Sequence, residues 1–281
     1  MAEIVKISTI PGLAFDVLSD GPEGAPLVLF LHGFAESFHT WDAQIAAIAR
    51  AGYRAIAPSQ RGYSPGARPT AIADYALTEC VDDALSIMDT LGVTRFHVVG
   101  HDWGAAVAWH LTAMHPDRVL TLTAISVPHP GATSAALHDA ESDQRERSSY
   151  MRLFADLDKA VPLLLESDAQ RLKALFIGSG MDDEEIEKYA GPLRDPAALR
   201  GALSWYAAIF AHRPPMAPAV VVPTTHLWSN GDFALGRRGA EATQQFVTAD
   251  YRFIELDGVT HWIADQAPEA TVEAILSRVR S

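Results

Sequence analysis

Residues 100–104, Gly-His-Asp-Trp-Gly, have the spacing and the residue types best suited to chemistry in this chain. They lie between an apolar run rich in β-branched side chains (96–99) and a helical pattern (105–111). A sharp turn from a strand into a helix exposes its central side chain, here Asp102. Glycines flank such a turn because the neighbouring backbone packs too closely for a Cβ atom. The segment therefore predicts a nucleophilic carboxylate on a strained turn.

An aspartate at this position limits the chemistry that the turn can perform. A serine that attacks a saturated carbon forms an ether, which water does not open, whereas a carboxylate forms an ester, which water can cleave. Asp102 therefore predicts a substrate with a leaving group on a saturated carbon, such as an epoxide or an alkyl halide. The alternative is a glycine-rich strand-to-helix turn whose aspartate only caps the helix.

Two later loops could supply the acid and the base that a nucleophile needs. Asp232 ends a loop that follows an apolar strand, and His261 lies in the loop after the last predicted strand. Asp102, Asp232 and His261 follow one another along the chain in the order nucleophile, acid, histidine, which is one of the orders known for catalytic triads. Taken singly, Asp232 could be a turn residue and His261 a hydrogen-bonded loop histidine. His101 and His110 also lie near the turn, but they fall outside that order.

Strands and helices alternate along most of the chain. We expect strands at 3–9 and 13–18, paired through a turn at Pro11–Gly12, and then at 27–31, 54–57, 95–99, 119–126, 224–228 and 251–256. We expect helices at 41–51, 77–91, 236–247 and 268–279. Such alternation predicts an α/β fold with a mostly parallel sheet flanked by helices.

A helical stretch from about 132 to 211 interrupts this alternation, and proline-rich segments bound it on both sides. We therefore predict a core domain of residues 1–130 and 215–281 and a helical cap, or lid, of residues 131–214. The cap should cover the carboxyl ends of the strands, where open α/β sheets bind ligands. Within it, the acidic run 182–185 predicts the first turn of a helix rather than a metal site.

Composition excludes several classes of function. The 281 residues carry a formal net charge of −13, which argues against nucleic acid and anionic membranes as partners. The single cysteine, Cys80, excludes an intrachain disulfide and is interpreted as a packing residue. We see no signal peptide and no membrane span, and we expect a cytoplasmic protein. The oligomeric state stays open, with a homodimer as one option.

Several motifs together show a family resemblance. They are His-Gly-Phe-Ala-Glu-Ser at 32–37, Trp41, Arg-Gly-Tyr-Ser-Pro-Gly at 61–66, Gly-His-Asp-Trp-Gly-Ala at 100–105 and Gly-Val-Thr-His-Trp at 258–262. In these motifs the chain resembles the α/β-hydrolase-fold epoxide hydrolases across nearly the whole core. The resemblance implies opening of a small apolar epoxide by water to a vicinal diol, without a metal or cofactor.

The resemblance also implies further site residues. Tyr206 matches one of two cap tyrosines that polarise the epoxide oxygen, and Tyr150 matches the other more loosely; either could instead be a core aromatic. The backbone N–H groups of Phe34 and Trp103 would form the oxyanion hole. We expect the side chains of Phe34, Trp103 and Trp205 to line the substrate pocket. In two departures, Ala35 replaces the usual proline and Ser59 replaces an aspartate.

Three other functions stay open from the sequence. A haloalkane dehalogenase uses the same triad, but it needs a second halide donor that Phe34 lacks and that Trp205 alone in the cap could supply. A protein that keeps the fold only to bind a ligand would not need His261. A weaker option is acyl hydrolysis with Asp102 as a base.

Overall fold

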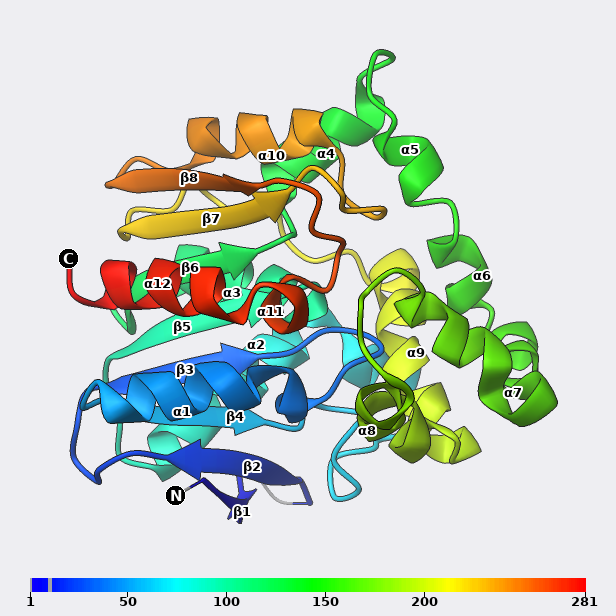
Figure 1. The fold of residues 1–281 in the computed structure, drawn as a ribbon, viewed down its shortest axis with the longest axis horizontal. Coiled ribbons are helices and arrows are strands. Elements are labelled where there is room, and N and C mark those ends of the chain that lie inside the picture. The colour runs from blue at the N-terminus through cyan, green and yellow to red at the C-terminus, as the bar shows by residue number, and fades with distance from the viewer. Residues whose placement is uncertain (1, 10–11) are drawn as a thin grey trace.

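A computed structural model describes residues 2–9 and 12–281, and an eight-stranded sheet lies at its centre (Figure 1). The strand order is β1-β2-β4-β3-β5-β6-β7-β8. The strands are β1 (Glu3–Ser8), β2 (Ala14–Asp20), β3 (Leu27–Leu31), β4 (Arg54–Pro58), β5 (Phe96–His101), β6 (Val119–Ile125), β7 (Thr224–Ser229) and β8 (Tyr251–Leu256). All neighbours from β4 to β8 are parallel, and β2 is antiparallel to both β1 and β4. The predicted α/β fold is confirmed, while Pro11 of the expected turn lies outside the described residues.

Helices cover both faces of this sheet. They are α1 (Asp42–Arg50), α2 (Leu77–Thr90), α3 (Trp103–Met114), α10 (Arg237–Ala242), α11 (Ile263–Gln266) and α12 (Pro268–Val279). Helices α1 and α12 contact each other on one face, and α2 and α3 on the other. Strands β3 and β5 are buried along their whole length, as expected of continuous apolar runs between two helical layers.

Most of the predicted core elements agree with the structure. β8 and α12 have the predicted bounds, and Cys80 is buried in the core on α2. The predicted helix 236–247 consists of α10 followed by a separate 3₁₀ turn, Thr243–Phe246. Within the described ranges, every helix is too short or too polar to span a bilayer.

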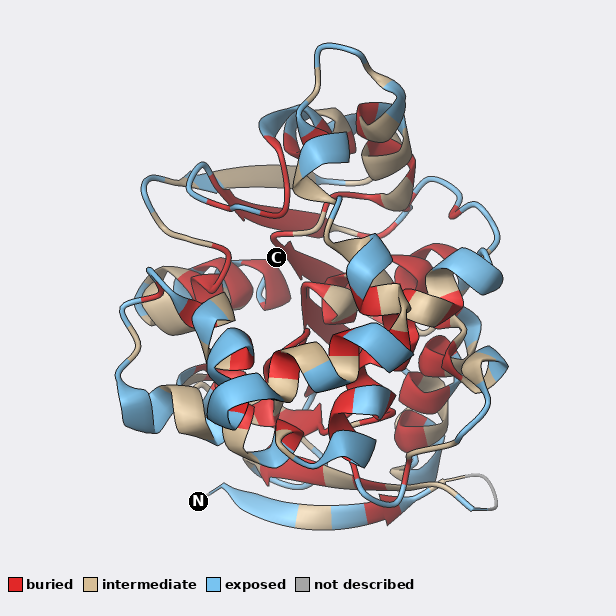
Figure 2. Cartoon of the chain, turned by 90° about the vertical axis from the view of Figure 1, so that its right-hand side faces the viewer, coloured by how far each residue is buried: buried red, intermediate tan, exposed pale blue. Residues whose placement is uncertain are grey.

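The segment between β6 and β7 is helical, as predicted. It contains α4 (Pro130–His138), α5 (Gln144–Arg147), α6 (Met151–Ala155), α7 (Leu157–Lys173), α8 (Asp183–Leu193) and α9 (Pro196–Ala211). Helices α6 to α9 share an apolar cluster and lie at the edge of the sheet where β3 and β5 end (Figures 1 and 2). Helix α4 instead contacts α10 on the core, and the cap boundaries 131–214 stay a prediction. The acidic run opens α8 through a capping box of Asp182 and Glu185, as expected.

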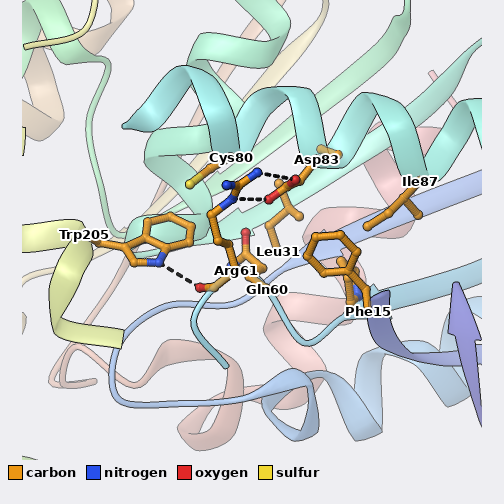
Figure 3. A pocket seen from close by; sticks show the side chains of 10 residues that line it. Phe15, Leu31, Gln60, Arg61, Cys80, Asp83, Ile87 and Trp205 are labelled. Carbon is orange, nitrogen blue, oxygen red and sulfur yellow. Dashed lines mark hydrogen bonds and ion pairs between the residues drawn. The ribbon is translucent and has the colours of Figure 1, made fainter. Parts of the chain in front are cut away.

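A buried ion pair fixes the loop that follows β4. The guanidinium of Arg61 donates to both carboxylate oxygens of Asp83 on α2, at 2.7 Å each (Figure 3). The carbonyl of Arg61 accepts a hydrogen bond of 2.9 Å from the indole N–H of Trp205 on α9. In the same region, a Cβ atom on Gly62 would overlap the backbone of Gly201. The loop therefore joins the core to the cap at a fixed spacing.

We expect Asp83→Ala to lower the free energy of unfolding by about 3 kcal/mol, because it leaves a buried guanidinium without its carboxylate. Urea denaturation measures the change, with Asp82→Ala, an exposed residue one position earlier in α2, as the matched control. Equal stability of the two variants would contradict the role given to this pair.

Candidate active site

Asp102 occupies a strained turn between β5 and α3. Its φ of +49° lies in the left-handed region that residues with a side chain rarely adopt. A Cβ atom on Gly100 would overlap the carbonyl of Gly104, and one on Gly104 would overlap the carbonyl of Leu31. The expectation that both flanking positions require glycine is therefore confirmed.

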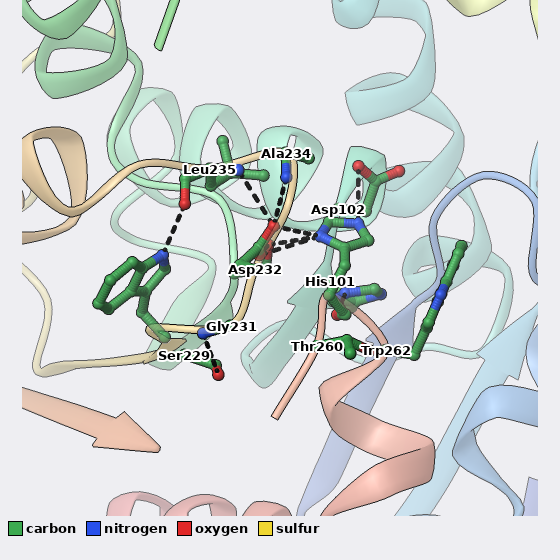
Figure 4. Close-up of polar contacts among 12 residues, drawn as sticks. His101, Asp102, Ser229, Gly231, Asp232, Ala234, Leu235, Thr260 and Trp262 are labelled. Carbon is green, nitrogen blue, oxygen red and sulfur yellow. Dashed lines mark hydrogen bonds and ion pairs between the residues drawn. The ribbon is translucent and has the colours of Figure 1, made fainter. Parts of the chain in front are cut away.

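The three residues predicted to form a triad lie together. The imidazole of His261 places Nε2 3.5 Å from Oδ2 of Asp102 and Nδ1 3.0 Å from Oδ2 of Asp232. Figure 4 shows Asp102 and Asp232 at the ends of this line of contacts. All three side chains are buried. Loops after β5, β7 and β8 supply them, so the parallel sheet brings together residues that lie 159 positions apart at most (102 to 261).

The imidazole of His261 lies between two carboxyl groups. Burial alone lowers its pKa, but the charges and hydrogen bonds of Asp232 and Asp102 outweigh burial and raise the pKa well above its ordinary value. Burial in turn favours the neutral carboxyl groups, yet His261 holds the pKa of both Asp102 and Asp232 below the ordinary value. The three shifts therefore favour the same charge arrangement, with both carboxyl groups ionised and the imidazole protonated.

Groups that sequence analysis missed hold the carboxylate of Asp232. Its Oδ1 accepts hydrogen bonds from the backbone N–H of Ala234 at 2.8 Å and of Leu235 at 3.0 Å (Figure 4). Its Oδ2 accepts a bond of 2.6 Å from the hydroxyl of Ser126, the residue after β6. A serine at the end of a strand is too common to indicate the contact of Ser126 with Asp232. The tight turn after Asp232, in contrast, indicates that backbone N–H groups can bond its carboxylate.

The loop after β3 supplies a donor to the proposed nucleophile. The N–H of Phe34 lies 2.9 Å from Oδ1 of Asp102. Next to it, a Cβ atom on Gly33 would overlap the carboxylate of Asp102. The peptide bond from Phe34 to Ala35 is cis. Trp103 is the first residue of α3, so its N–H is among the amides that the helix leaves unpaired.

Two buried histidines, His32 and His101, hold the loops around the site through hydrogen bonds. His32 lies 3.0 Å from the carbonyl of Gly33 through Nδ1 and accepts from the N–H of Gln60 through Nε2, as expected of a structural residue. Burial lowers the pKa of His32 to about 4. His101 contacts Glu36 at 2.8 Å and lies 2.9 Å from the carbonyl of His261 through Nε2. His101 therefore holds the backbone of the loop that carries His261.

The two cap tyrosines pack beside residues that flank the site, and the charge of Asp102 acts on both. Tyr206 on α9 has its ring 5.0 Å from that of Trp103 and 5.5 Å from that of Phe34. Tyr150, just before α6, has its ring 6.2 Å from that of Tyr206. Burial and the charge of Asp102 raise the pKa of both phenols, so both keep their protons. Two hydroxyl donors therefore lie within the electrostatic field of Asp102.

Trp205 lies beside this group with its donor directed elsewhere. Its ring is 5.9 Å from that of Trp103, but its N–H is bonded to the carbonyl of Arg61. It therefore does not offer the second halide donor that a dehalogenase would need.

Across residues 2–9 and 12–281, no three His, Cys, Asp or Glu side chains group as ligands for one metal ion.

Comparisons with known proteins show which proteins this chain is similar to. Residues 26–268 match the family described as alpha/beta hydrolase fold. The chain is 32% identical to AB hydrolase superfamily protein YfhM of Bacillus subtilis over 96% of both chains. It is 31% identical to Epoxide hydrolase 4 of Homo sapiens, over 92% of this chain and 73% of that protein. A solved structure reported among novel epoxide hydrolases from metagenomes of hot environments superposes with a TM-score of 0.88 at 29% identity, over 99% of this chain and 98% of that one.

We expect Asp102→Asn to lower the pKa of His261, because the substitution removes one of the two anions that favour the imidazolium. ¹⁵N NMR of the histidine side chains measures it, with the signal identified by its loss in His261→Gln. Asp257→Asn, an exposed carboxylate in the loop before His261, is the control and should leave the titration unchanged. An unchanged titration in Asp102→Asn would refute the charge arrangement.

Proposed function

Since the chain belongs to the epoxide hydrolases of the α/β-hydrolase fold family, we propose that it opens an epoxide to a vicinal diol through an ester on Asp102. The observation that carries the proposal is the carboxylate of Asp102, which has the imidazole of His261 on one oxygen and the N–H of Phe34 on the other. The other reactants are a small apolar epoxide and water.

The first half-reaction forms the ester. A carboxylate oxygen of Asp102 attacks the less hindered ring carbon, and the bond from that carbon to the ring oxygen breaks. Tyr150 and Tyr206 hydrogen-bond the ring oxygen, and one of them donates its proton as the alkoxide forms. The raised pKa of both phenols keeps that proton available in the resting site.

Ester formation converts His261 into a base. The ester carries no charge, so the imidazolium keeps only Asp232 as an anionic neighbour and its pKa falls. The proton that it releases restores the hydroxyl of the cap tyrosine. Nucleophile and base are thus activated in sequence, because the first step removes the charge that held the base protonated.

The second half-reaction cleaves the ester. Neutral His261 takes a proton from water, whose oxygen attacks the carbonyl carbon of Asp102. The N–H groups of Phe34 and Trp103 stabilise the oxyanion that forms. The carbonyl carbon then releases the alkoxide, which takes the proton of the new carboxyl group and leaves as the diol. Asp102 is again a carboxylate and His261 an imidazolium.

We expect His261→Gln to form the ester and then stall, because glutamine is not a base for water. After incubation with styrene oxide, intact mass spectrometry should show a gain of one substrate mass, located on the peptide that contains Asp102. Asp102→Asn should gain no mass. A wild-type enzyme that makes diol while His261→Gln gives no adduct would favour direct attack of water on the epoxide.

We expect Tyr206→Phe and Tyr150→Phe each to slow ester formation by about a hundredfold, because each removes an acid for the ring oxygen. Rapid-quench measurement of the adduct in a His261→Gln background isolates this step. Tyr53→Phe, which removes a hydroxyl bonded to the carbonyl of Val279, is the control. An unchanged rate in either cap variant would remove that tyrosine from the mechanism.

A further inference from the structure

We propose that Ser126 is a positioning residue that acts with Asp232 to hold His261 in the tautomer and orientation that cleave the ester. The inference rests on the proposed function and extends it to a residue outside the triad. Ser126 follows β6, which lies in the sheet between β5, the strand before Asp102, and β7, the strand before Asp232. The strand order therefore places its hydroxyl between the nucleophile loop and the acid loop.

The hydroxyl of Ser126 contacts both partners of the acid–base pair. Its Oγ lies 2.6 Å from Oδ2 of Asp232 and 3.1 Å from Nδ1 of His261. A hydroxyl has one proton to donate, and the short contact to the carboxylate assigns that proton to Asp232. Towards Nδ1 the oxygen then has only lone pairs to offer. Nδ1 must carry a proton to satisfy this contact, which leaves Nε2, facing Asp102, as the basic nitrogen once the imidazole is neutral.

Without this hydroxyl, Asp232 alone would orient the imidazole. The carboxylate spans Nδ1 with contacts of 3.1 and 3.0 Å, so the ring could turn within that fork. Ser126 adds a third contact from a different strand. Its effect belongs to the second half-reaction, because attack by Asp102 on the epoxide does not require a neutral His261.

The backbone conformation at Ser126 also indicates that its side chain has a function. Its φ of +68° lies in the left-handed region, where glycine is favoured over residues with a Cβ atom. Its N–H donates to the carbonyl of Leu227 at 2.8 Å, and its carbonyl lies 3.3 Å from Nε2 of His226. The fold thus holds a serine where a glycine would be less strained, in the position from which its hydroxyl reaches two site residues.

Two substitutions separate the hydroxyl from the backbone. Ser126→Ala and Ser126→Gly both remove the hydroxyl, but only glycine relieves the left-handed conformation. We expect both to form the ester from styrene oxide at close to the wild-type rate and to hydrolyse it about tenfold more slowly, the effect of losing one hydrogen bond to a charged group. Rapid-quench mass spectrometry follows the formation and loss of the adduct in single turnovers.

Further variants test the same distinction. Ser126→Thr keeps the hydroxyl but adds a β-branch, so it should hydrolyse the ester faster than Ser126→Ala while melting at a lower temperature than Ser126→Gly. Ser64→Ala removes a buried hydroxyl that is bonded to the carbonyl of Ser59, and it should match the wild type in both half-reactions.

Two results would overturn the inference. One is wild-type ester hydrolysis in Ser126→Gly, because the backbone alone would then explain any effect of alanine. The other is an equal fall in both half-reactions in both variants, which indicates general damage to the site. Failure of His261→Gln to form the ester would refute the proposed function instead. That variant keeps Ser126, so the two failures can be told apart.

Discussion

A buried imidazole between two carboxyl groups governs the arrangement of this protein. Isolated charges are costly to bury, so each member of the group needs a partner at hydrogen-bond distance. His261 satisfies Asp102 and Asp232, and backbone N–H groups satisfy the remaining carboxylate oxygens: that of Phe34 on Asp102 and those of Ala234 and Leu235 on Asp232. These groups come from loops after four parallel strands, β3, β5, β7 and β8. The register of the sheet therefore sets the electrostatics of the site.

The choice of aspartate over serine at position 102 has an electrostatic consequence as well as a chemical one. A serine would be neutral in the resting site, and His261 would face Asp232 alone. With Asp102 present, its charge helps to raise the pKa of His261, which in the proposed mechanism keeps the imidazole from competing as a base during the first step. In the proposed mechanism, conversion of the carboxylate to an ester lowers the pKa of His261 and so allows the second step. One residue would then provide both the bond that is formed and the change in charge that allows its cleavage.

Sequence patterns predicted the parts of this arrangement that repeat along the chain. Alternating apolar and helical runs gave the parallel sheet, and residues at strand ends, Asp102, Asp232 and His261, could be placed together because parallel strands end at one edge. Contacts made by single side chains across the fold could not be predicted. Ser126 is an ordinary serine in sequence, and only the left-handed backbone after β6 aims its hydroxyl at Asp232. The direction of the Trp205 indole likewise depends on the carbonyl of Arg61, which no local pattern reveals.

Attachment of the cap to the core holds Tyr206 against Phe34 and Trp103, and Tyr150 beside Tyr206. Contacts spread along the cap hold it: the indole of Trp205 on Arg61, the hydroxyl of Tyr189 on Asp265 at 2.7 Å, and the indole of Trp262 on the carbonyl of Leu175 at 3.2 Å. Phe154 fills the space between the tyrosines, with its ring 5.2 Å from each. Donors held in this way need no reorganisation when negative charge develops on the ring oxygen, and fixed donors stabilise a transition state more than mobile ones do. In the proposed mechanism the cap therefore contributes fixed donors to catalysis.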